Sequence, residues 1–410
     1  MRESVREIKV GIDFGNEVEP VGRLAQRDAI VYFEYDDTFL SKSIELSPFR
    51  LPLQSGLIEL PAKPFEGLAG VFADSLPDGW GRLLFDRMMR KDGILPAAIT
   101  VLDRLAYVGE YGMGALVYEP DKSPFSEENE IDLDYLADQT KQVLEGESEL
   151  VIKELLALNG SSAGARPKAL IGVDEKRETI VHGAKQLTPN FEHWLVKFPN
   201  TQDGNDAGAI EYVYALMANQ AGILMPDVHL FPSDKGSGYF AVKRFDRERN
   251  ERFHLHTVAG LTHSDFRFPS LDYEDLIALT RSLTQDHREV EKMYRLAVFN
   301  VMVHNRDDHA KNFSFLMNSK GQWSMTPAYD LTFSSGPGGE HSTMVMGEGK
   351  NPTVNHLRKL GLNMGLSKEL VDSILEQTKE AIVSWRKLAS EYGVSKENVN
   401  LIGKVIDQYV

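Results

Sequence analysis

A polar loop between two apolar runs is the feature that most constrains this chain. Residues 303–316 read V-H-N-R-D-D-H-A-K-N-F-S-F-L, and the apolar run 296–303 leads into the loop. Apolar flanks on both sides indicate that a packed scaffold holds the loop, a setting in which functional residues are common. The ordinary alternative is a solvated, salt-bridged surface loop built from its charged residues.

The spacing of polar residues around this loop indicates phosphoryl transfer. Asp307 and Asn312 stand five positions apart, and Asp330 follows an apolar segment, the order in which kinase-like phosphotransferases present a base and two metal ligands. We predict that Asp307 orients the attacking hydroxyl and takes its proton. Asn312 and Asp330 would supply the oxygen ligands that Mg²⁺ prefers. Lys311 is predicted to neutralise charge on the transferred group, with His309 as a further nucleotide contact.

Composition limits the remaining classes of function. The 410 residues are 42% hydrophobic, enough for two or three domains, and the formal net charge of −16 argues against a broad nucleic-acid-binding surface. The chain has no cysteine, which excludes disulfides and zinc thiolate sites. The N-terminus lacks an apolar signal core, and no run of about 18 apolar residues occurs. We therefore expect a soluble, cytoplasmic protein that does not enter membranes.

Periodicity predicts the main elements. Residues 7–60 read as a small sheet with hairpins, and L-P-D-G at 76–79 reads as a turn before a helix from Trp80 to Arg90. The glycines of Y-V-G-E-Y-G-M-G at 107–114 have the wrong order for a nucleotide-binding loop, so we reject that reading. Further helices are predicted over 133–158, 276–300 and 368–392, the last with Ser367 as N-cap.

Residues 160–171, G-S-S-A-G-A-R-P-K-A-L-I, form a candidate phosphate loop. Its small residues let backbone amides approach an anion, and Arg166 and Lys168 add positive charge, although a plain connecting loop fits equally well. Lys197 ends an apolar strand at 193–198 and could reach the nucleotide phosphates, or face solvent. Glu211, in the first turn of a helix beginning near Ala209, could pair with Lys197, or serve the helix dipole.

A strand at 238–247, G-Y-F-A-V-K-R-F-D-R, follows these elements. A strand that leaves into a polar segment can act as a hinge that offers main-chain groups to adenine. Asp246 could then reach a ribose hydroxyl. The glycine-rich segment 334–351 follows Asp330, where kinases keep the loop that receives the substrate.

Taken together, these motifs resemble the HipA family of serine/threonine kinase toxins. The resemblance rests on S-x-A-G-A-R-P-K at 161–168, W-L-V-K-F-P at 194–199, V-K-R-F-D-R at 242–247, N-R-D-D-H-A-K-N-F-S at 305–314 and P-A-Y-D-L at 327–331, with F-x-x-S-L-P-D-G-x-G-R at 72–82. The resemblance implies the same roles for Asp307, Asn312, Asp330 and Lys197. Asp308 stands where a glycine is common in the family. We therefore predict that Asp308 is a bystander, or a charge outside the metal's ligands. It further implies a phosphate loop of Ala163, Gly164, Ala165, Arg166, Pro167 and Lys168, a hinge of Lys243, Arg244 and Phe245, Asp246 near the ribose and Tyr329 at the nucleotide. It also implies an autophosphorylated serine at Ser161, with Ser162 as the alternative acceptor.

The sequence therefore predicts an α+β, two-lobed protein-kinase-like fold with a mixed α/β N-terminal lobe and an all-α C-terminal lobe. The expected parts are 1–120, 121–245 with the phosphate loop, lysine strand and hinge, and 246–410 with the catalytic loop. The resemblance implies an ATP- and Mg²⁺-dependent kinase acting on a protein serine or threonine. It also implies a toxin neutralised by a small DNA-binding partner of HipB type, with DNA reached only through that partner. A small-molecule phosphotransferase of the aminoglycoside-kinase type and a non-catalytic binding protein remain the alternatives.

Overall fold

The computed structural model describes residues 4–124, 129–146, 152–159, 164–183, 187–200 and 204–410. The chain divides into two compact units. The first comprises Met1–Gln202, Ala241–His263 and Leu316–Gln322, and the second comprises Asp203–Phe240, Ser264–Phe315 and Trp323–Val410. Segments distant in the sequence therefore build each unit.

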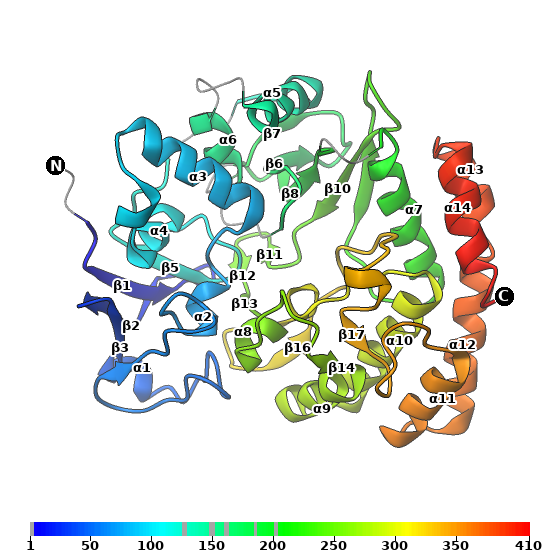
Figure 1. The fold of residues 1–410 in the computed structure, drawn as a ribbon. Coiled ribbons are helices and arrows are strands. Elements are labelled where there is room, and N and C mark those ends of the chain that lie inside the picture. Colours follow the sequence, from blue (N-terminus) through cyan, green and yellow to red (C-terminus); the bar gives the residue numbers. More distant parts are fainter. Residues whose placement is uncertain (1–3, 125–128, 147–151, 160–163, 184–186, 201–203) are drawn as a thin grey trace. The chain divides into compact units, whose positions relative to one another are not determined.

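An antiparallel five-stranded sheet begins the first unit (Figure 1), with the strand order β4-β3-β2-β1-β5. In β1, Ile8, Val10 and Ile12 are buried because alternate side chains of a strand share a face. This confirms the predicted small sheet. The strands are β1 (Glu7–Ile12), β2 (Glu19–Arg27), β3 (Ile30–Tyr35), β4 (Ile58–Glu59) and β5 (Leu116–Glu119).

The predicted helix after the L-P-D-G turn is α3 (Gly79–Lys91). Gly79 has φ +44°, a conformation that favours glycine, and Trp80, Leu84 and Met88 recur every four residues on the buried face. The other helices of this unit are α1 (Asp37–Leu40), α2 (Gly70–Ala73), η1 (Pro96–Ala98), α4 (Val101–Val108), α5 (Leu133–Glu145), α6 (Ile152–Asn159) and α8 (Val258–Thr262).

A second antiparallel sheet in the first unit contains β7 (Ile180–His182), β6 (Lys168–Asp174), β8 (Phe191–Lys197) and the 241–243 part of β10 (Tyr239–Lys243), in that order. Strands β8 and β10 confirm that the two segments predicted to carry Lys197 and the hinge are strands, while their roles stay predictions. The register pairs Lys168 of β6 directly with Lys197 of β8. Three short strands, β11 (Arg247–Glu248), β12 (Glu251–Arg252) and β13 (His254–Thr257), follow β10.

A buried polar cluster centred on Asp74 joins α2 to β13 and α8. The Asp74 carboxylate accepts hydrogen bonds from Thr257 N and Oγ1, both at 2.7 Å, and lies 2.6 Å from His256 Nδ1. His256 Nε2 is 3.0 Å from Ser47 Oγ. The order Ser-His-Asp resembles a hydrolase triad, but Ser47 and His256 are each 0% exposed. The cluster is therefore structural, since no substrate can reach the hydroxyl.

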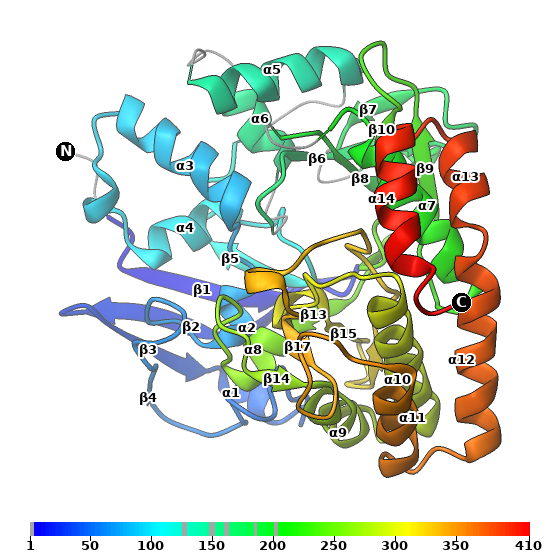
Figure 2. The same ribbon diagram turned by 45° about the vertical axis from the view of Figure 1, so that its right-hand side comes forward.

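The second unit is mainly helical (Figure 2). α10 lies against α9 and α12, and α7 packs on α12 and α13. Tyr214 of α7 donates a hydrogen bond of 2.7 Å to the carbonyl of Val303, where α10 has just ended. The helices are α7 (Ala207–Gln220), α9 (Tyr273–Thr284), α10 (His287–Met302), η2 (Ala310–Asn312), η3 (Pro337–Gly339), α11 (Val354–Asn363), α12 (Lys368–Ile382), α13 (Trp385–Glu391) and α14 (Lys396–Ile406).

The structure corrects three predicted helix lengths. The helix expected over 276–300 is divided by Gln285, at φ +53°, and Asp286 caps the second half by accepting from Arg288 N. Gly146, at φ +86°, ends α5 before the expected residue 158. The 368–392 helix is likewise split between α12 and α13, although the Ser367 cap is confirmed. Left-handed cap residues overrode a continuous apolar stripe at the first two of these breaks.

The prediction of an all-α C-terminal lobe from residue 246 is also wrong, because this part of the chain includes strands as well as helices. β14 and β17 pair in parallel through Leu271 with Thr343 and Asp272 with Met344. Short runs such as these are too brief for periodicity to reveal. Besides β11 to β13, the strands are β14 (Leu271–Asp272), β15 (Ser314–Met317), β16 (Trp323–Met325) and β17 (Thr343–Met344); β9 (Val228–Phe231) lies earlier in the second unit.

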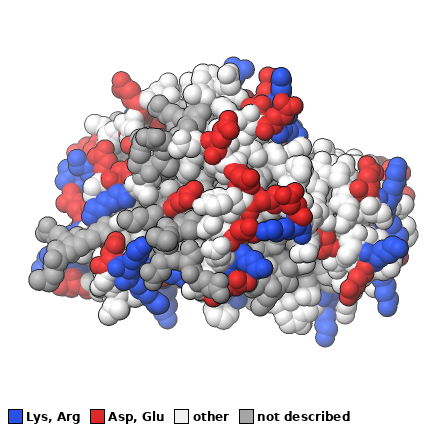
Figure 3. Space-filling model, turned by 90° about the horizontal axis from the view of Figure 1, so that it is seen from above, with Lys and Arg blue, Asp and Glu red and all other residues white. Residues whose placement is uncertain are grey.

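The surface of the described residues carries charges of both signs. Acidic and basic side chains are interspersed over the face seen in Figure 3, so the formal charge of −16 is not gathered into one patch there. Among the described residues, no helix has both the length and the apolar character needed to cross a bilayer.

The buried histidines predict that the folded protein loses stability as the pH falls. Burial first, and the neighbouring His256 second, lower the pKa of His254 from 6.5 to about 3. As the pH falls below 6.5, the unfolded chain binds a proton at this residue that the folded chain excludes. The free energy of unfolding should therefore fall with pH by about 1.4 kcal/mol per unit for this histidine. Urea unfolding between pH 7.5 and 4.5 measures the slope.

His254→Gln, which can still donate to the Leu46 carbonyl 3.1 Å away, should flatten that slope. His287→Gln, at an exposed position, provides the comparison for a histidine replaced outside the core. Equal slopes in the wild type and His254→Gln would refute the assignment.

Candidate active site

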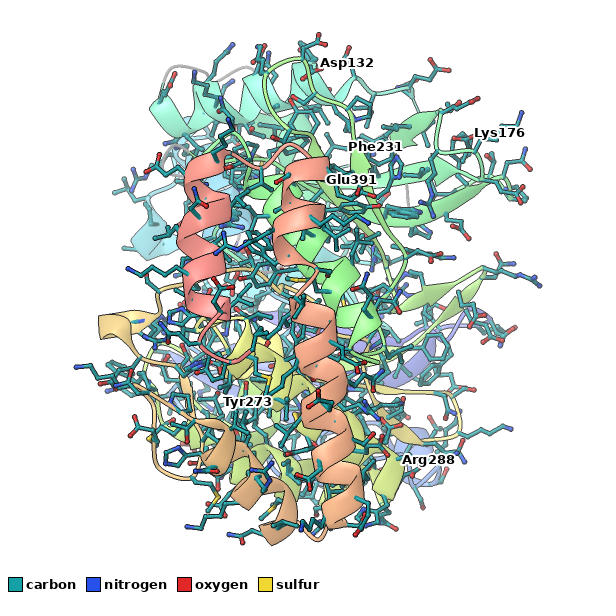
Figure 4. The ribbon with its side chains drawn as sticks, turned by 90° about the vertical axis from the view of Figure 1, so that its right-hand side faces the viewer. Asp132, Lys176, Phe231, Tyr273, Arg288 and Glu391 are labelled. Carbon is teal, nitrogen blue, oxygen red and sulfur yellow. The ribbon has the colours of Figure 1, made fainter. Side chains whose placement is uncertain are left out.

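The loop after α10 is held from beneath by a chain of buried hydrogen bonds. Asn305 Nδ2 donates to Asn300 Oδ1 at 3.0 Å, and Asn300 Nδ2 donates to the Tyr273 hydroxyl at 3.0 Å. That hydroxyl donates to Asp308 Oδ2 at 2.8 Å. Burial, then the Asp308 charge, raises the pKa of Tyr273 well above its ordinary value, so the phenol stays a donor. Figure 4 shows Tyr273 inside the helical bundle, in contrast to Arg288 at its edge.

Asp308 is the centre of this network. Its side chain is 0% exposed, and it also accepts from Ser342 N at 2.9 Å and Thr343 N at 3.2 Å, with His341 Nδ1 at 3.0 Å. A buried carboxylate is tolerated when donors surround it in this way. Asp308 is thus no bystander to the loop, because this residue fixes its fold; the other predicted role, a charge outside the metal's ligands, stays a prediction.

Arg306 connects the loop to the segment after Asp330. Its guanidinium donates to the carbonyls of Gly339 and, at 2.7 Å, of Lys350. Its own carbonyl accepts from Ser342 N and Oγ, each at 3.1 Å. The glycine-rich segment predicted to receive the substrate is thus tied to the two residues on either side of Asp307.

Asp307 points the other way from Asp308. Its side chain is 59% exposed, and its backbone carbonyl accepts a hydrogen bond of 2.7 Å from Asn312 Nδ2. His309 Nε2 lies 4.0 Å from Asp307 Oδ1, while His309 Nδ1 accepts from Lys311 N at 3.3 Å. Since Nδ1 is the acceptor, the proton of the neutral ring is assigned to Nε2, facing the carboxylate. An accessible carboxylate on a fixed backbone can act as a general base.

Asp330 occupies a strained position. Its φ of +54° is rare for a residue with a side chain, and such strain gathers at functional sites. The adjacent Tyr329 donates from its hydroxyl to the Lys311 carbonyl at 2.7 Å and also contacts Ser314 Oγ. Tyr329 thereby fastens the segment of Asp330 to the one that carries Asn312. The sequence placed Tyr329 at the nucleotide and gave no sign of this contact.

The candidate phosphate loop belongs to the first unit, where it rests on the L-P-D-G turn. Gly164 N donates to the Asp78 carboxylate, and Trp80 N donates to the Gly164 carbonyl at 3.2 Å. A side chain at Gly164 would collide with the ammonium of Lys168, which is 5% exposed. The L-P-D-G turn at 76–79, for which the sequence predicted only a turn before a helix, therefore supports the candidate phosphate loop. Of the predicted loop and its regulatory site, Ala163 and Ser161 lie outside the described residues.

The hinge assignment of Asp246 needs correction. Asp246 is 0% exposed, and its oxygens accept from Arg244 Nε at 2.9 Å, Arg247 Nη1 at 2.9 Å and Gly114 N at 2.7 Å. Burial alone would raise its pKa, but Arg244 and Arg247 outweigh burial and hold the pKa far below the ordinary value. A side chain so enclosed is not available to a ribose, so Asp246 and Arg244 act as structural ion pairs.

The glycine segment at 107–114, which we rejected as a phosphate loop, accepts hydrogen bonds from the arginines around Asp246. The carbonyl of Gly112 accepts from Arg247 Nη2 at 3.0 Å, and that of Gly114 accepts from Arg252 Nη2 at 3.1 Å.

Lys243, the first hinge residue, pairs with Glu192 at 2.6 Å. Phe245 stays a hinge prediction, as do Ala165, Arg166 and Pro167 for the phosphate loop. Glu211 is buried in α7, and its pairing with Lys197 also stays a prediction.

Comparison with known proteins places both parts of the chain in one family. Residues 160–386 match the model of the HipA-like C-terminal domain, and residues 16–119 match that of the HipA N-terminal domain. In Sinorhizobium fredii (strain NBRC 101917 / NGR234), "Putative kinase Y4mE" is 25% identical over 415 residues, 93% of each chain. "Putative kinase Y4dM" of the same organism is 25% identical over 234 residues, 52% of this chain and 55% of that protein.

A solved structure shares the fold. The HipA chain in the Shewanella oneidensis MR-1 structure titled as a toxin–antitoxin system of HipA, HipB and operator DNA aligns with a TM-score of 0.68 at 16% identity. The alignment covers 98% of this chain and 95% of that one. The chain therefore shares the fold of that HipA chain over nearly its whole length.

The two neighbouring aspartates should differ sharply in their effect on stability. Asp308→Asn places an amide nitrogen among hydrogen-bond donors and should lower the free energy of unfolding by about 2 kcal/mol or more. The matched variant Asp307→Asn changes an exposed carboxylate and should cost about 0.5 kcal/mol or less. Urea denaturation at pH 7.5 compares them. Equal losses would contradict the division of roles.

Proposed function

This chain belongs to the HipA family, and on that premise we propose that it is an ATP- and Mg²⁺-dependent kinase that phosphorylates a serine or threonine of a protein. One observation carries the proposal. The carboxylate of Asp307 is exposed, whereas the residues on either side of it are engaged in holding the loop to its scaffold. An aspartate presented in this way suits the orientation of a substrate hydroxyl.

Asp307 accepts the hydroxyl proton as the oxygen attacks the γ-phosphorus. The bond from phosphorus to the bridging oxygen of ADP breaks as the new oxygen–phosphorus bond forms. His309 Nε2 lies 4.0 Å from Asp307 Oδ1, beside the carboxylate that takes the proton. The Lys311 ammonium stabilises negative charge on the transferred group.

Asn312 and Asp330 are the residues that would hold Mg²⁺. The fit rests on their chemistry: Asn312 Nδ2 is occupied by the Asp307 carbonyl, so its Oδ1 is the atom left for a metal. One amide oxygen and one carboxylate suit an ion that takes its other ligands from phosphate and water. When bound, Mg²⁺ supplies charge neutralisation and alignment of the phosphates.

The phosphates themselves would be met by the Gly164–Lys168 loop and by Lys197. Lys168 and Lys197 are direct cross-strand partners, which brings two positive charges to one face of the sheet. An anion relieves the repulsion between them. The support for this assignment is the register of β6 and β8 together with the glycine conformation at Gly164, φ +107°.

We also propose that the protein is the toxin of a toxin–antitoxin pair and that a small DNA-binding protein neutralises it. The support is family membership and the Shewanella oneidensis structure, whose title names HipA with HipB and operator DNA. With a formal charge of −16, this chain would reach DNA only through such a partner.

Asp307→Asn should abolish transfer and leave the fold intact. The amide keeps the size of the side chain but cannot take the proton, so kcat should fall by about 100-fold or more. The initial rate of phosphorylation of a purified substrate protein measures the effect. Turnover within a few-fold of the wild type would exclude Asp307 as the base.

Asp330→Asn should weaken Mg²⁺-ATP binding by about tenfold or more. Asparagine tolerates the left-handed backbone at this position, so the variant changes charge without adding strain. Calorimetric titration gives the affinity, and Asp307→Asn serves as the control because it should bind nearly as tightly as the wild type. Equal weakening in both variants would contradict the separation of metal ligand and base.

A further inference from the structure

An aromatic residue from a distant part of the second unit lies beside the catalytic loop. Phe266 is half-buried in the segment between α8 and β14, and the Lys311 Nζ lies 4.6 Å from its ring centroid. The ring of His309 also packs on it, with centroids 5.3 Å apart and planes at 55°. Lys311 and His309 are the two residues that accompany Asp307 in the proposed reaction. Phe266 therefore contacts both.

We propose that Phe266 is a positioning residue of the transfer reaction, holding the Lys311 ammonium and the His309 imidazole beside Asp307. This inference rests on the proposed function and adds a residue to the same site. A cation over an aromatic face is attracted by the negative potential of the ring. The ring also packs against the imidazole and restricts its rotation.

The chemistry explains why an aromatic ring suits this position. A carboxylate would hold the lysine more strongly, but it would add a negative charge that cancels the ammonium's field at the transferred phosphoryl group. The ring orients the ammonium and brings no formal charge, so the positive charge remains effective in the transition state. The effect of Phe266 should consequently appear in kcat, because it acts through a group used in the transition state.

The chain offers a matched control two residues away. Phe268 is 69% exposed, so Phe268→Leu makes the same chemical change in the same segment outside the site. Phe266→Leu should lower kcat by about fivefold to tenfold and leave the KM for Mg²⁺-ATP unchanged. Phe266→Tyr retains the ring face and should restore kcat, whereas Phe268→Leu should match the wild type.

A double-mutant cycle tests whether Phe266 acts through Lys311. In a Lys311→Met background, Phe266→Leu should cause little further loss, since the group it positions is gone. An equal loss in both backgrounds would overturn the inference. Full kcat in Phe266→Leu would also overturn it and leave the proposed function standing, whereas an inactive wild type overturns the proposed function itself.

The contact also has a readout that needs no activity. With ¹³C-labelled lysine, the ε-methylene signal of Lys311, identified by its absence from Lys311→Met, should be shifted upfield by the ring current of Phe266. The shift should disappear in Phe266→Leu and persist in Phe268→Leu. An unchanged signal in Phe266→Leu would show that the ring does not hold the ammonium.

Discussion

The buried carboxylate of Asp308 is the constraint on which the catalytic loop depends. A charge with no access to water is tolerated only if donors replace the water. Here they come from two separate segments: the Tyr273 hydroxyl at the start of α9, and the run 341–343, which supplies the His341 ring and the amides of Ser342 and Thr343. Satisfying one charge therefore brings α9 and the segment after Asp330 against the loop at residues 305–308.

This arrangement sets the orientation of the next carboxylate. Asp308 is directed inward, while the side chain of Asp307 is 59% exposed. Arg306 adds a second tie to the Gly339 and Lys350 carbonyls, so Asp307 is flanked on both sides by anchored residues. As the proposed general base, Asp307 would take its rigidity from these neighbours and keep the accessibility that a protein hydroxyl requires.

Sequence reasoning proposed candidate site residues from their order along the chain. Asp307, Asn312 and Asp330 could be selected because phosphoryl transfer requires that order of side chains, and the strands of Lys197 and Lys243 followed from short apolar runs. The roles of Asp308 and Asp246 could not be predicted. Both are acidic residues in polar segments, and only the tertiary structure shows that one is enclosed by a phenol, an imidazole and backbone amides and the other by arginines.

Other features were missed for different physical reasons. The breaks at Gln285 and Gly146 depend on a left-handed residue at a cap, which interrupts a stripe that remains apolar. Phe266 lies far from the catalytic loop in sequence, and its segment has no motif to suggest the contact.

Kinase chemistry within the HipA family is the central claim of this account. Incubating the protein with γ-³²P-ATP, Mg²⁺ and cell lysate tests it most directly: label in a discrete protein band, absent with Asp307→Asn, is predicted. Label confined to small molecules, or equal labelling by both proteins, would contradict it.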